Sequence, residues 1–439
     1  MDFDAAVNYL LSLGHETLAM KLGLANVTRL LAALGDPQRA YPAVQIAGTN
    51  GKGSTAAMLA AVCRAAGVRA GLYTSPHLVS ITERVQVDGR ELAPAEFARH
   101  AAAVRAAAET LHAETGARPT FFEQVTAVAL EAFSAARVRL AILETGLGGR
   151  LDATTAARAA TVALTPLALD HQAYLGDTLA EIAAEKAAII RAGARVVLAP
   201  QAPEAETVIT ARCRECGVTP RRATDDIEMH DATPDGRLRA TFRTETDSYE
   251  RVLLALRGRH QLTNAAVAVA LAEELRAQGF DITRAAIIEG LERARHPGRL
   301  ELRPGAPAVL LDGAHNPAGA AALGAYLDEF ARAPVTLVFG AMADKPLAEM
   351  AARLFPAAAR LVLTAPPNPR AAAPAALLQL ARAHVAPERV TLAPTPADAL
   401  RLARAATPPD GLVCVTGSLY LVGAIMQRLD DEGRAEHAS

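Results

Sequence analysis

A glycine-rich segment near residue 50 has the residue types of a phosphate-binding loop. Glycines let backbone N–H groups turn toward phosphate oxygens, a lysine adds a positive charge, and a serine hydroxyl can ligate magnesium. The segment differs from the common GxxxxGK[ST] pattern, because isoleucine stands at the first glycine position and an extra glycine precedes the serine. An incidental glycine-rich turn is the alternative, but its place between a predicted strand and a predicted helix favours the phosphate loop. Its residues are Gly48, Thr49, Asn50, Gly51, Lys52, Gly53 and Ser54.

Other polar residues are expected at the same edge of the predicted sheet as this loop. Glu144 ends the apolar run 138–144 and precedes a glycine-rich turn, which favours a metal ligand over a surface carboxylate. Asp170 and His171 follow the next predicted strand, 161–165. Their location at this edge makes a functional histidine and a structural one equally good interpretations.

Lys186 lies on the apolar face of a helix predicted over residues 177–191. A lysine is rarely buried unless it is paired or its charge is removed. The structural interpretation is that Lys186 extends to solvent or pairs with an acid such as Glu185. The functional interpretation is that Lys186 is chemically altered or drawn into a metal site.

The composition predicts a globular protein without a nucleic-acid partner. A length of 439 residues predicts roughly two or three domains, and 51% hydrophobic with 21% charged residues is not the composition of a disordered chain. The net charge is −2 and the arginines alternate with acids, so we expect no nucleic-acid partner. We expect no membrane span and a cytoplasmic location, because no long apolar run or signal pattern is found. Four cysteines are too few for a disulfide framework, and Cys213 and Cys216 are interpreted as neighbours on a helix rather than a zinc half-site.

Strand and helix patterns alternate along most of the chain. Continuous apolar strands between helices predict an α/β fold with a mostly parallel, doubly wound sheet, to which residues 81–88 add antiparallel. A smaller α/β Rossmann-like unit is predicted from residue 296, after a Pro- and Gly-containing junction. The predicted domains are therefore 1–295 and 296–439. Ligands are expected at the carboxyl ends of the strands. The remaining predicted strands are 43–47, 69–73, 195–199, 309–312, 335–340, 360–364, 390–392 and 412–416.

The phosphate loop GTNGKGS resembles that of the folylpolyglutamate synthase/dihydrofolate synthase family, within the Mur ligase superfamily. Further motifs match in the same order, from about residue 20 to residue 423. The resemblance implies an ATP-binding domain with a folate pocket over 1–295 and a glutamate-ligase domain over 296–439. In this family ATP phosphorylates a substrate carboxylate, and the amino group of L-glutamate then displaces the phosphate with the help of magnesium. The implied acceptors are tetrahydrofolate and, in bifunctional members, dihydropteroate.

The stretch 169–190 resembles the signature helix of the family, in which the lysine is carbamylated. By this resemblance Lys186 is carbamylated and catalytic, although alanine stands at residue 188, where the family usually has glycine. Two magnesium sites are implied. The first would use Ser54, Ser75 and Glu144, and the second Glu144, His171 and the modified Lys186.

Three matching segments imply the acceptor pocket: residues 21–24, residues 120–123 and residues 149–153. Two adjacent phenylalanines could equally be core residues. The aspartate of the third segment recognises dihydropteroate in bifunctional members, which favours both activities here. The implied substrate residues are Lys21, Leu22, Gly23, Leu24, Thr120, Phe121, Phe122, Glu123, Leu151, Asp152 and Ala153.

The resemblance also implies roles for residues later in the chain. Asn264 and Arg299 would bind the nucleotide together with the phosphate loop, in which Lys52 is also catalytic. Asp312 and His315 lie in a DGAHNP turn, where they would otherwise be a helix cap and a bystander. The family uses this turn for nucleotide and glutamate, and either residue could take up the amine proton. Ser418 is implied at the glutamate site.

Two other functions are considered. A Mur-type ligase acting on a UDP-sugar peptide is disfavoured by the aromatic segment 120–123 and by the lack of a recognisable UDP-binding domain. An ATP-binding regulatory module without turnover is disfavoured because Lys52, Glu144, His171 and Lys186 are all present. A monofunctional folylpolyglutamate synthase stays open. The expected partners are small molecules only, and we expect a monomer.

Overall fold

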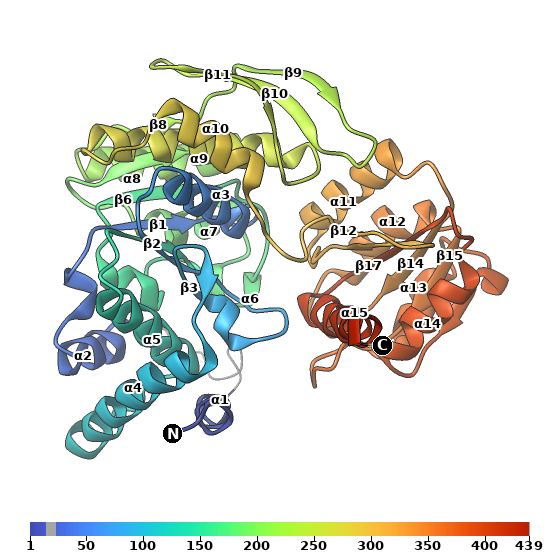
Figure 1. Ribbon diagram of the computed structural model, residues 1–439, viewed down its shortest axis with the longest axis horizontal. Helices are drawn as coiled ribbons and strands as arrows, with labels where there is room; N and C mark the ends of the chain where they lie inside the picture. The colour runs from blue at the N-terminus through green and yellow to red at the C-terminus, as the bar shows by residue number, and fades with distance from the viewer. Residues whose placement is uncertain (15–22, 439) are drawn as a thin grey trace. The chain divides into compact units, whose positions relative to one another are not determined.

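The computed structural model describes residues 1–14 and 23–438, except for the side chains of residues 435–438. These residues form two compact units, which are coloured by residue number in Figure 1. Each unit is described by itself. Unit 1 comprises Met1–Glu228, Thr241–Val252 and Thr263–Arg295, and unit 2 comprises Met229–Ala240, Leu253–Leu262 and His296–Ser439.

The centre of unit 1 is a sheet in which the described residues form eight strands. All pairs in it are parallel except those that β3 makes with β2 and β4, so the predicted doubly wound α/β fold is confirmed. The central strand β1 is buried along its whole length, as its apolar sequence predicts. In spatial order the strands are β4 (Arg90–Glu91), β3 (Val85–Val87), β2 (Ala70–Tyr73), β5 (Leu140–Glu144), β1 (Ala43–Ala47), β6 (Thr161–Leu164), β7 (Arg195–Leu198) and β8 (Arg221–Arg222).

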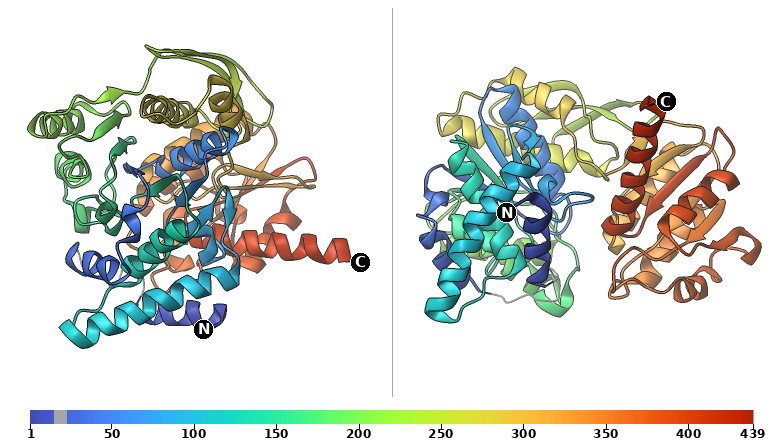
Figure 2. Two further views of the ribbon diagram at one scale, coloured as in Figure 1. Left: turned by 60° about the vertical axis from the view of Figure 1, so that its left-hand side comes forward. Right: turned by 60° about the horizontal axis from the view of Figure 1, so that its bottom comes forward.

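Helices connect and cover these strands. Helices α4 and α5 lie side by side (Figures 1 and 2). Helices α3 and α10 approach so closely that a Cβ atom at Gly290 would lie 2.4 Å from the Val62 backbone. The helices are α1 (Phe3–Ser12), α2 (Ala25–Ala33), α3 (Lys52–Ala65), α4 (Pro94–Thr115), α5 (Phe121–Ala135), α6 (Gln172–Leu175), α7 (Leu179–Ala187), α8 (Pro203–Glu215), α9 (His260–Ala277) and α10 (Arg284–Arg293).

The antiparallel addition predicted over 81–88 is shorter than expected. Residues Ile81–Arg84 form a 3₁₀ turn, η2, and only Val85–Val87 pair with β2. The turn forms because Ser80 and Glu83 make a capping box, in which each side chain accepts a hydrogen bond from the backbone N–H of the other residue. The alternating polarity of residues 81–88 predicted a strand and gave no indication of this cap.

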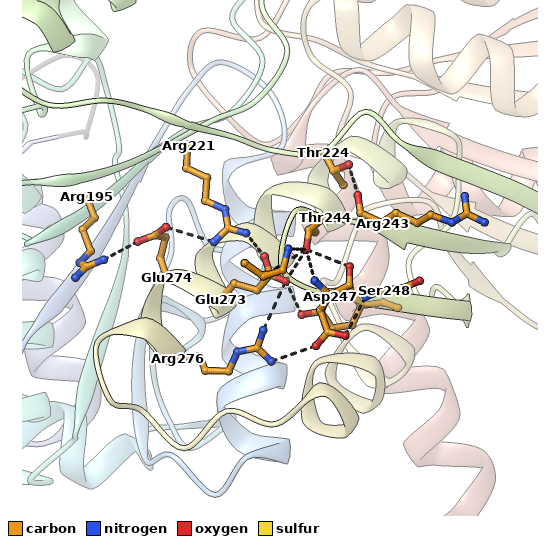
Figure 3. A network of polar contacts seen from close by, with 12 residues as sticks. Arg195, Arg221, Thr224, Arg243, Thr244, Asp247, Ser248, Glu273, Glu274 and Arg276 are labelled. Atoms are coloured by element: carbon orange, nitrogen blue, oxygen red, sulfur yellow. Dashed lines mark hydrogen bonds and ion pairs between the residues drawn. The ribbon is translucent and has the colours of Figure 1, made fainter.

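A three-stranded sheet follows β8 and was not predicted. Its strands are β9 (Ile227–Ala232), β10 (Leu238–Arg243) and β11 (Ser248–Leu253), in the order β11-β10-β9, and its residues are divided between the two units. In unit 1 its turn is joined to α9 through the buried Glu273 (Figure 3). The Glu273 carboxylate pairs with Arg221 and accepts hydrogen bonds from the hydroxyls of Thr244 and Tyr249, each at 2.8 Å. A buried carboxylate with these partners is satisfied, so the network holds α9 in place.

Unit 2 contains a sheet in which the described residues form six strands. The strands predicted from residue 309 onward are confirmed to within one residue, whereas the antiparallel edge strand β12 was not predicted. The order is β12 (Glu301–Arg303), β13 (Ala308–Leu311), β17 (Leu412–Thr416), β14 (Val335–Phe339), β15 (Arg360–Leu363) and β16 (Val390–Leu392). The helices are α11 (Pro317–Phe330), α12 (Leu347–Leu354), α13 (Pro374–Ala381), α14 (Pro396–Ala406) and α15 (Leu419–Ala438).

Across the described residues, none of the helices combines the length and the apolar character that crossing a membrane requires.

Candidate functional site

The phosphate loop connects β1 to α3, as the sequence predicts. Its backbone has φ 149° at Gly48 and 89° at Gly51, a region that side chains rarely adopt. A Cβ atom at Gly48 would lie 1.8 Å from Oγ1 of Thr165, and one at Gly51 would lie 2.1 Å from Oδ1 of Asn264. Both positions therefore require glycine, and the second brings Asn264 of α9 against the loop.

The rest of the loop is tied to the segment that follows β6. The N–H groups of Thr49 and Asn50 donate to the Pro166 carbonyl, and the Thr49 hydroxyl donates to the Ala168 carbonyl at 3.0 Å. Lys52 Nζ donates to the Thr49 carbonyl at 3.2 Å. The start of a helix has N–H groups without intrahelical acceptors, so the beginning of α3 is a suitable position for an anion.

Neighbouring strands bring Ser75 and Glu144 to this edge of the sheet. Glu144 at the end of β5 is in register with Ile46 of β1, and Ser75 follows the parallel strand β2. The Ser75 N–H donates to Glu144 Oε2 at 3.1 Å. Glu144 and Ser54 are both buried. The sheet thus gathers oxygen donors beside the phosphate loop.

Lys186 is buried and joins α7 to the phosphate loop. The residue is only 5% exposed, and its Nζ donates a hydrogen bond to the Gly48 carbonyl at 2.8 Å. Burial lowers the pKa of Lys186 to about 7, and the positive charge of Lys52 acts in the same direction, against the opposing charges of Asp170 and Asp152. A lysine with this pKa is largely neutral in mildly alkaline solution, so its amine is nucleophilic.

Helix α7, which carries Lys186 two turns after its start, begins with a capping box. The Thr178 hydroxyl accepts from the Glu181 N–H, and the Glu181 carboxylate accepts from the Thr178 N–H. We expect Thr178→Ala to lower the free energy of unfolding by about 1 kcal/mol, because one N–H loses its acceptor. Thermal unfolding should show the loss. Any activity that depends on Lys186 should change by less than about threefold, since burial also holds this residue; a much larger loss of activity would show that the cap sets the register of the lysine.

His171 and Asp170 lie beside each other before the short helix α6. His171 has φ 53°, and its Nε2 is 4.0 Å from Asp170 Oδ2. Within residues 1–14 and 23–434, no three His, Cys, Asp or Glu side chains form a metal-binding group. The oxygen donors Ser54, Ser75 and Glu144 nevertheless suit magnesium, which keeps waters and phosphate oxygens among its ligands.

The segment around α5 and the 3₁₀ turn η3 (Ala153–Ala157) is built on aromatic and acidic residues. The Phe122 ring lies so close to Gly146 that a Cβ atom there would be 2.5 Å from Cζ, while Phe121 is buried. Asp152 accepts from the N–H groups of Leu147 at 2.9 Å and of Thr154 at 3.0 Å, and burial raises its pKa. The other predicted residues of this pocket have plain structural positions. Thr120 and Glu123 form the capping box of α5, Ala153 is buried, Leu151, Gly23 and Leu24 are partly buried, and Lys21 and Leu22 lie outside the described residues.

In unit 2 the DGAHNP turn follows β13 and lies next to the turn after the paired strand β17. Asp312 is buried and accepts from the N–H groups of Leu300 at 2.9 Å and Ala314 at 3.0 Å. Burial raises the pKa of Asp312, although the Arg299 charge opposes the rise. The Gly417 N–H donates to the Ala314 carbonyl, which brings the turn of Ser418 alongside.

The position of the ring hydrogen of neutral His315 follows from one hydrogen bond. Its Nδ1 is 2.8 Å from the Gly313 carbonyl oxygen, which can only accept, so Nδ1 must carry the hydrogen. Nε2 then has the lone pair that a base needs. Ser418 is buried and its hydroxyl accepts from the Tyr420 N–H at 3.1 Å. A Cβ atom at Gly313 would lie 2.1 Å from Arg299 Nη1, so the arginine packs on this turn.

The sequence did not predict two residues that pack against the predicted site residues. Thr165 fills the space at Gly48, and Arg84 contacts His77 and Phe121. No local pattern identifies either residue, because the contacts of Thr165 with Gly48 and of Arg84 with Phe121 join segments that are far apart in the sequence. The capping pair Ser80 and Glu83 did carry a recognisable signal in its spacing.

Two families match the chain in sequence. The Mur ligase middle domain matches residues 46–272, and the Mur ligase, glutamate ligase domain matches residues 298–419.

Individual relatives extend this similarity over nearly the whole chain. The dihydrofolate synthase/folylpolyglutamate synthase of Bacillus subtilis is 34% identical over 95% of this chain and 97% of its own length. A probable bifunctional folylpolyglutamate synthase/dihydropteroate synthase of Haloferax volcanii is 39% identical over 96% of this chain, which spans about half the length of that relative (50%). Among solved structures, Mycobacterium tuberculosis folylpolyglutamate synthase complexed with ADP aligns with a TM-score of 0.89 and 31% identity, covering 97% of this chain and 98% of that one.

Proposed function

The chain belongs to the folylpolyglutamate synthase/dihydrofolate synthase family of the Mur ligase superfamily, and from that premise we propose that it is an ATP-dependent ligase. It adds L-glutamate to tetrahydrofolate-type folates and to dihydropteroate, which gives dihydrofolate. The observation that carries this proposal is the buried contact of Lys186 with the phosphate loop. We assign the ATP site and folate pocket to residues 1–295 and the glutamate-ligase function to residues 296–439. A monomer in the cytoplasm completes the proposal.

The reaction has two steps. An oxygen of the acceptor carboxylate attacks the γ-phosphorus of ATP, which gives an acyl phosphate and releases ADP. The amine of glutamate then attacks the acyl carbon, forming the amide, and phosphate leaves with the bridging oxygen. Lys52 and the N–H groups at the start of α3 offset negative charge as the phosphoryl group moves. Asn264, whose side chain packs on Gly51, would orient the nucleotide at the loop.

Magnesium, when bound, would neutralise phosphate charge during transfer. Ser54, Ser75 and Glu144 would hold one ion, and their oxygen atoms suit this cation. Glu144, His171 and a carbamylated Lys186 would hold a second.

Carbamylation of Lys186 fits its surroundings. The neutral amine adds to carbon dioxide and releases one proton, which converts a buried cation into an anionic oxygen ligand. The carbamate nitrogen keeps one N–H, so its bond to the Gly48 carbonyl need not be lost. Because burial lowers the pKa of Lys186 to about 7, the reactive neutral form is abundant near neutral pH.

Residues of unit 2 complete the proposal. Arg299 and Asp312 would bind nucleotide, and Ser418 would line the glutamate site. We assign the uptake of the amine proton to Nε2 of His315, because its Nδ1 is committed to the Gly313 carbonyl. Asp312 is the second candidate, since its raised pKa also permits it to hold a proton.

Asp152 and the aromatic pair would form the acceptor pocket. Phe122 offers an apolar ring face for a flat heterocycle, and buried Asp152 offers a carboxyl group to its polar edge. Thr120, Leu151 and Ala153 would complete this pocket, and Asp152 is the residue that supports dihydropteroate as an acceptor.

A substrate panel tests the proposed function. Purified protein is incubated with ATP, magnesium and L-glutamate, and separate reactions receive dihydropteroate, tetrahydrofolate or a UDP-muramoyl peptide precursor. Glutamylated products of both pterin substrates are expected, with one phosphate released per amide. Product from tetrahydrofolate alone would leave a monofunctional synthase and contradict the role of Asp152. Product from the UDP-sugar alone, or ATP hydrolysis without an amide, would overturn the folate assignment.

A further inference from the structure

The loop of residues 74–80, which carries Ser75, is fastened by one carboxylate. Glu83 Oε2 accepts from the Leu78 N–H, and Oε1 accepts from the N–H groups of Val79 and Ser80, all at 2.7 Å. Three successive N–H groups around a carboxylate are a strong, charge-assisted arrangement. The path of the loop therefore depends on Glu83.

The start of the same loop is fastened by the backbone beside Glu83. The Thr74 N–H donates to the Arg84 carbonyl at 3.1 Å, and the Ser75 N–H donates to Glu144 at 3.1 Å. The loop is thus held at both ends, and one end is held against the carboxylate of β5.

The side chain of Arg84 joins this loop to α5. Arg84 is 2% exposed, and its Nε donates to Nδ1 of His77 at 2.8 Å. Its guanidinium lies over the Phe121 ring, 5.4 Å from the centroid. Arginine has no hydrogen-bond acceptor, so His77 Nδ1 must accept and the hydrogen of the neutral ring must be on Nε2.

We propose that Glu83 and Arg84 are positioning residues for the ligation: Glu83 fixes the loop that presents Ser75, and Arg84 fixes His77 as its Nε2–H form while tying that loop to Phe121. One buried side chain then connects the loop beside Glu144 with the helix start that we assign to the acceptor pocket. The reaction named here rests on the proposed function, but the contacts do not. Neither residue is assigned contact with a substrate.

Four variants test the proposal in steady-state assays of glutamylation. Arg84→Met keeps an unbranched apolar stem but removes the donors, Arg84→Lys restores a donor, and Glu83→Gln keeps the shape but cannot accept all three N–H groups. Glu91→Gln is the matched control, because Glu91 is an exposed acid of the adjoining strand that binds the Thr82 hydroxyl and not the loop.

We expect Arg84→Met and Glu83→Gln to lower kcat by about 10- to 100-fold, as small displacements of reacting groups do. The KM for ATP should change by less than about threefold, because the phosphate loop is untouched. Arg84→Lys should recover part of kcat, and Glu91→Gln should behave as the wild type. Unchanged kcat in both Arg84→Met and Glu83→Gln, or an equal loss in Glu91→Gln, would overturn the proposal.

A double-mutant cycle with His77→Gln shows whether Arg84 acts through His77. If it does, the combined variant should lose no more kcat than the worse single variant, whereas multiplied losses would contradict the link. Nitrogen-15 NMR of labelled histidine provides a readout without turnover. The signals of His77 are identified as those that are absent from the spectrum of His77→Gln. In the wild type these signals should report the neutral Nε2–H form, and they should change in Arg84→Met. An Nδ1–H form in the wild type would overturn the assignment. If the wild type made no glutamylated product, the proposed function would fail while this NMR test still decided the role of Arg84.

Discussion

Lys186→Met should reduce glutamylation by about 10³-fold, the scale expected when metal-dependent charge stabilisation of several kcal/mol is lost. The substitution removes both the site of carbamylation and the amine that contacts Gly48. Lys186→Arg should be equally inactive, because a guanidinium keeps the charge but does not form the carbamate. Initial rates with saturating ATP and folate measure the effect. Activity near that of the wild type in either variant would contradict the assigned role.

Two further measurements separate loss of the carbamate from loss of the fold. Mass analysis of the native wild type should show the added mass of one carbon dioxide, which should be absent from Lys186→Met. A small carboxylic acid added to Lys186→Ala should restore part of the rate, by supplying the missing oxygen ligand. No added mass and no rescue would contradict carbamylation.

Lys186→Met should also stabilise the metal-free protein in bicarbonate-free buffer. The folded-state pKa of about 7 is below the ordinary value of 10.5, so protonated Lys186 destabilises the folded protein, and this contribution has its full size below pH 7. This destabilisation disappears as the pH rises toward the unfolded-state value. Thermal unfolding at pH 6 should therefore show a larger gain for the variant than unfolding at pH 9; a loss of stability at pH 6 would contradict the buried, desolvated lysine.

Gly51→Ala should weaken nucleotide binding by at least about tenfold, which corresponds to 1.4 kcal/mol. The new Cβ atom would lie 2.1 Å from Asn264 Oδ1, and the backbone at φ 89° disfavours any side chain. Either the loop or the Asn264 side chain must move, and both are proposed to bind the nucleotide. Calorimetric titration with an ATP analogue measures the change.

Gly67→Ala is the matched control for this substitution. Gly67 also has a positive φ, of 68°, but no atom lies within 4 Å of an added Cβ. Backbone strain of about 1 kcal/mol should lower stability without changing nucleotide affinity. If Gly51→Ala and Gly67→Ala reduced nucleotide affinity equally, the contact with Asn264 would not be the cause.

The parallel strands could be predicted from the sequence because burial on both faces leaves continuous apolar runs. The predicted strand 43–47 coincides with β1, and 412–416 with β17. The strands over 227–253 were missed because none of them is a continuous apolar run: β9 and β11 are largely polar and partly exposed, and β10 has arginine and threonine between its buried apolar residues. The cap at Glu83 likewise replaced part of a predicted strand by η2.

The candidate site could be predicted in part for the same topological reason. Ser75, Glu144 and the phosphate loop converge because β2, β5 and β1 are parallel neighbours that end at one edge. The apolar spacing of α7 placed Lys186 on the face that the structure buries, but it left open that the side chain extends to solvent and did not show that the amine reaches Gly48. Contacts such as that of Arg84 with Phe121 depend on tertiary packing between distant segments, which local spacing does not encode.

An isotope-transfer experiment tests the central claim, ATP-driven activation of an acceptor carboxylate, most directly. Dihydropteroate labelled with oxygen-18 in its carboxylate is incubated with the protein, ATP, magnesium and L-glutamate, and the amide product and phosphate are analysed by mass spectrometry. An acyl phosphate carries one carboxylate oxygen to phosphorus, so dihydrofolate should form together with phosphate that contains a single labelled oxygen. Unlabelled phosphate alongside dihydrofolate, or no dihydrofolate at all, would contradict the account.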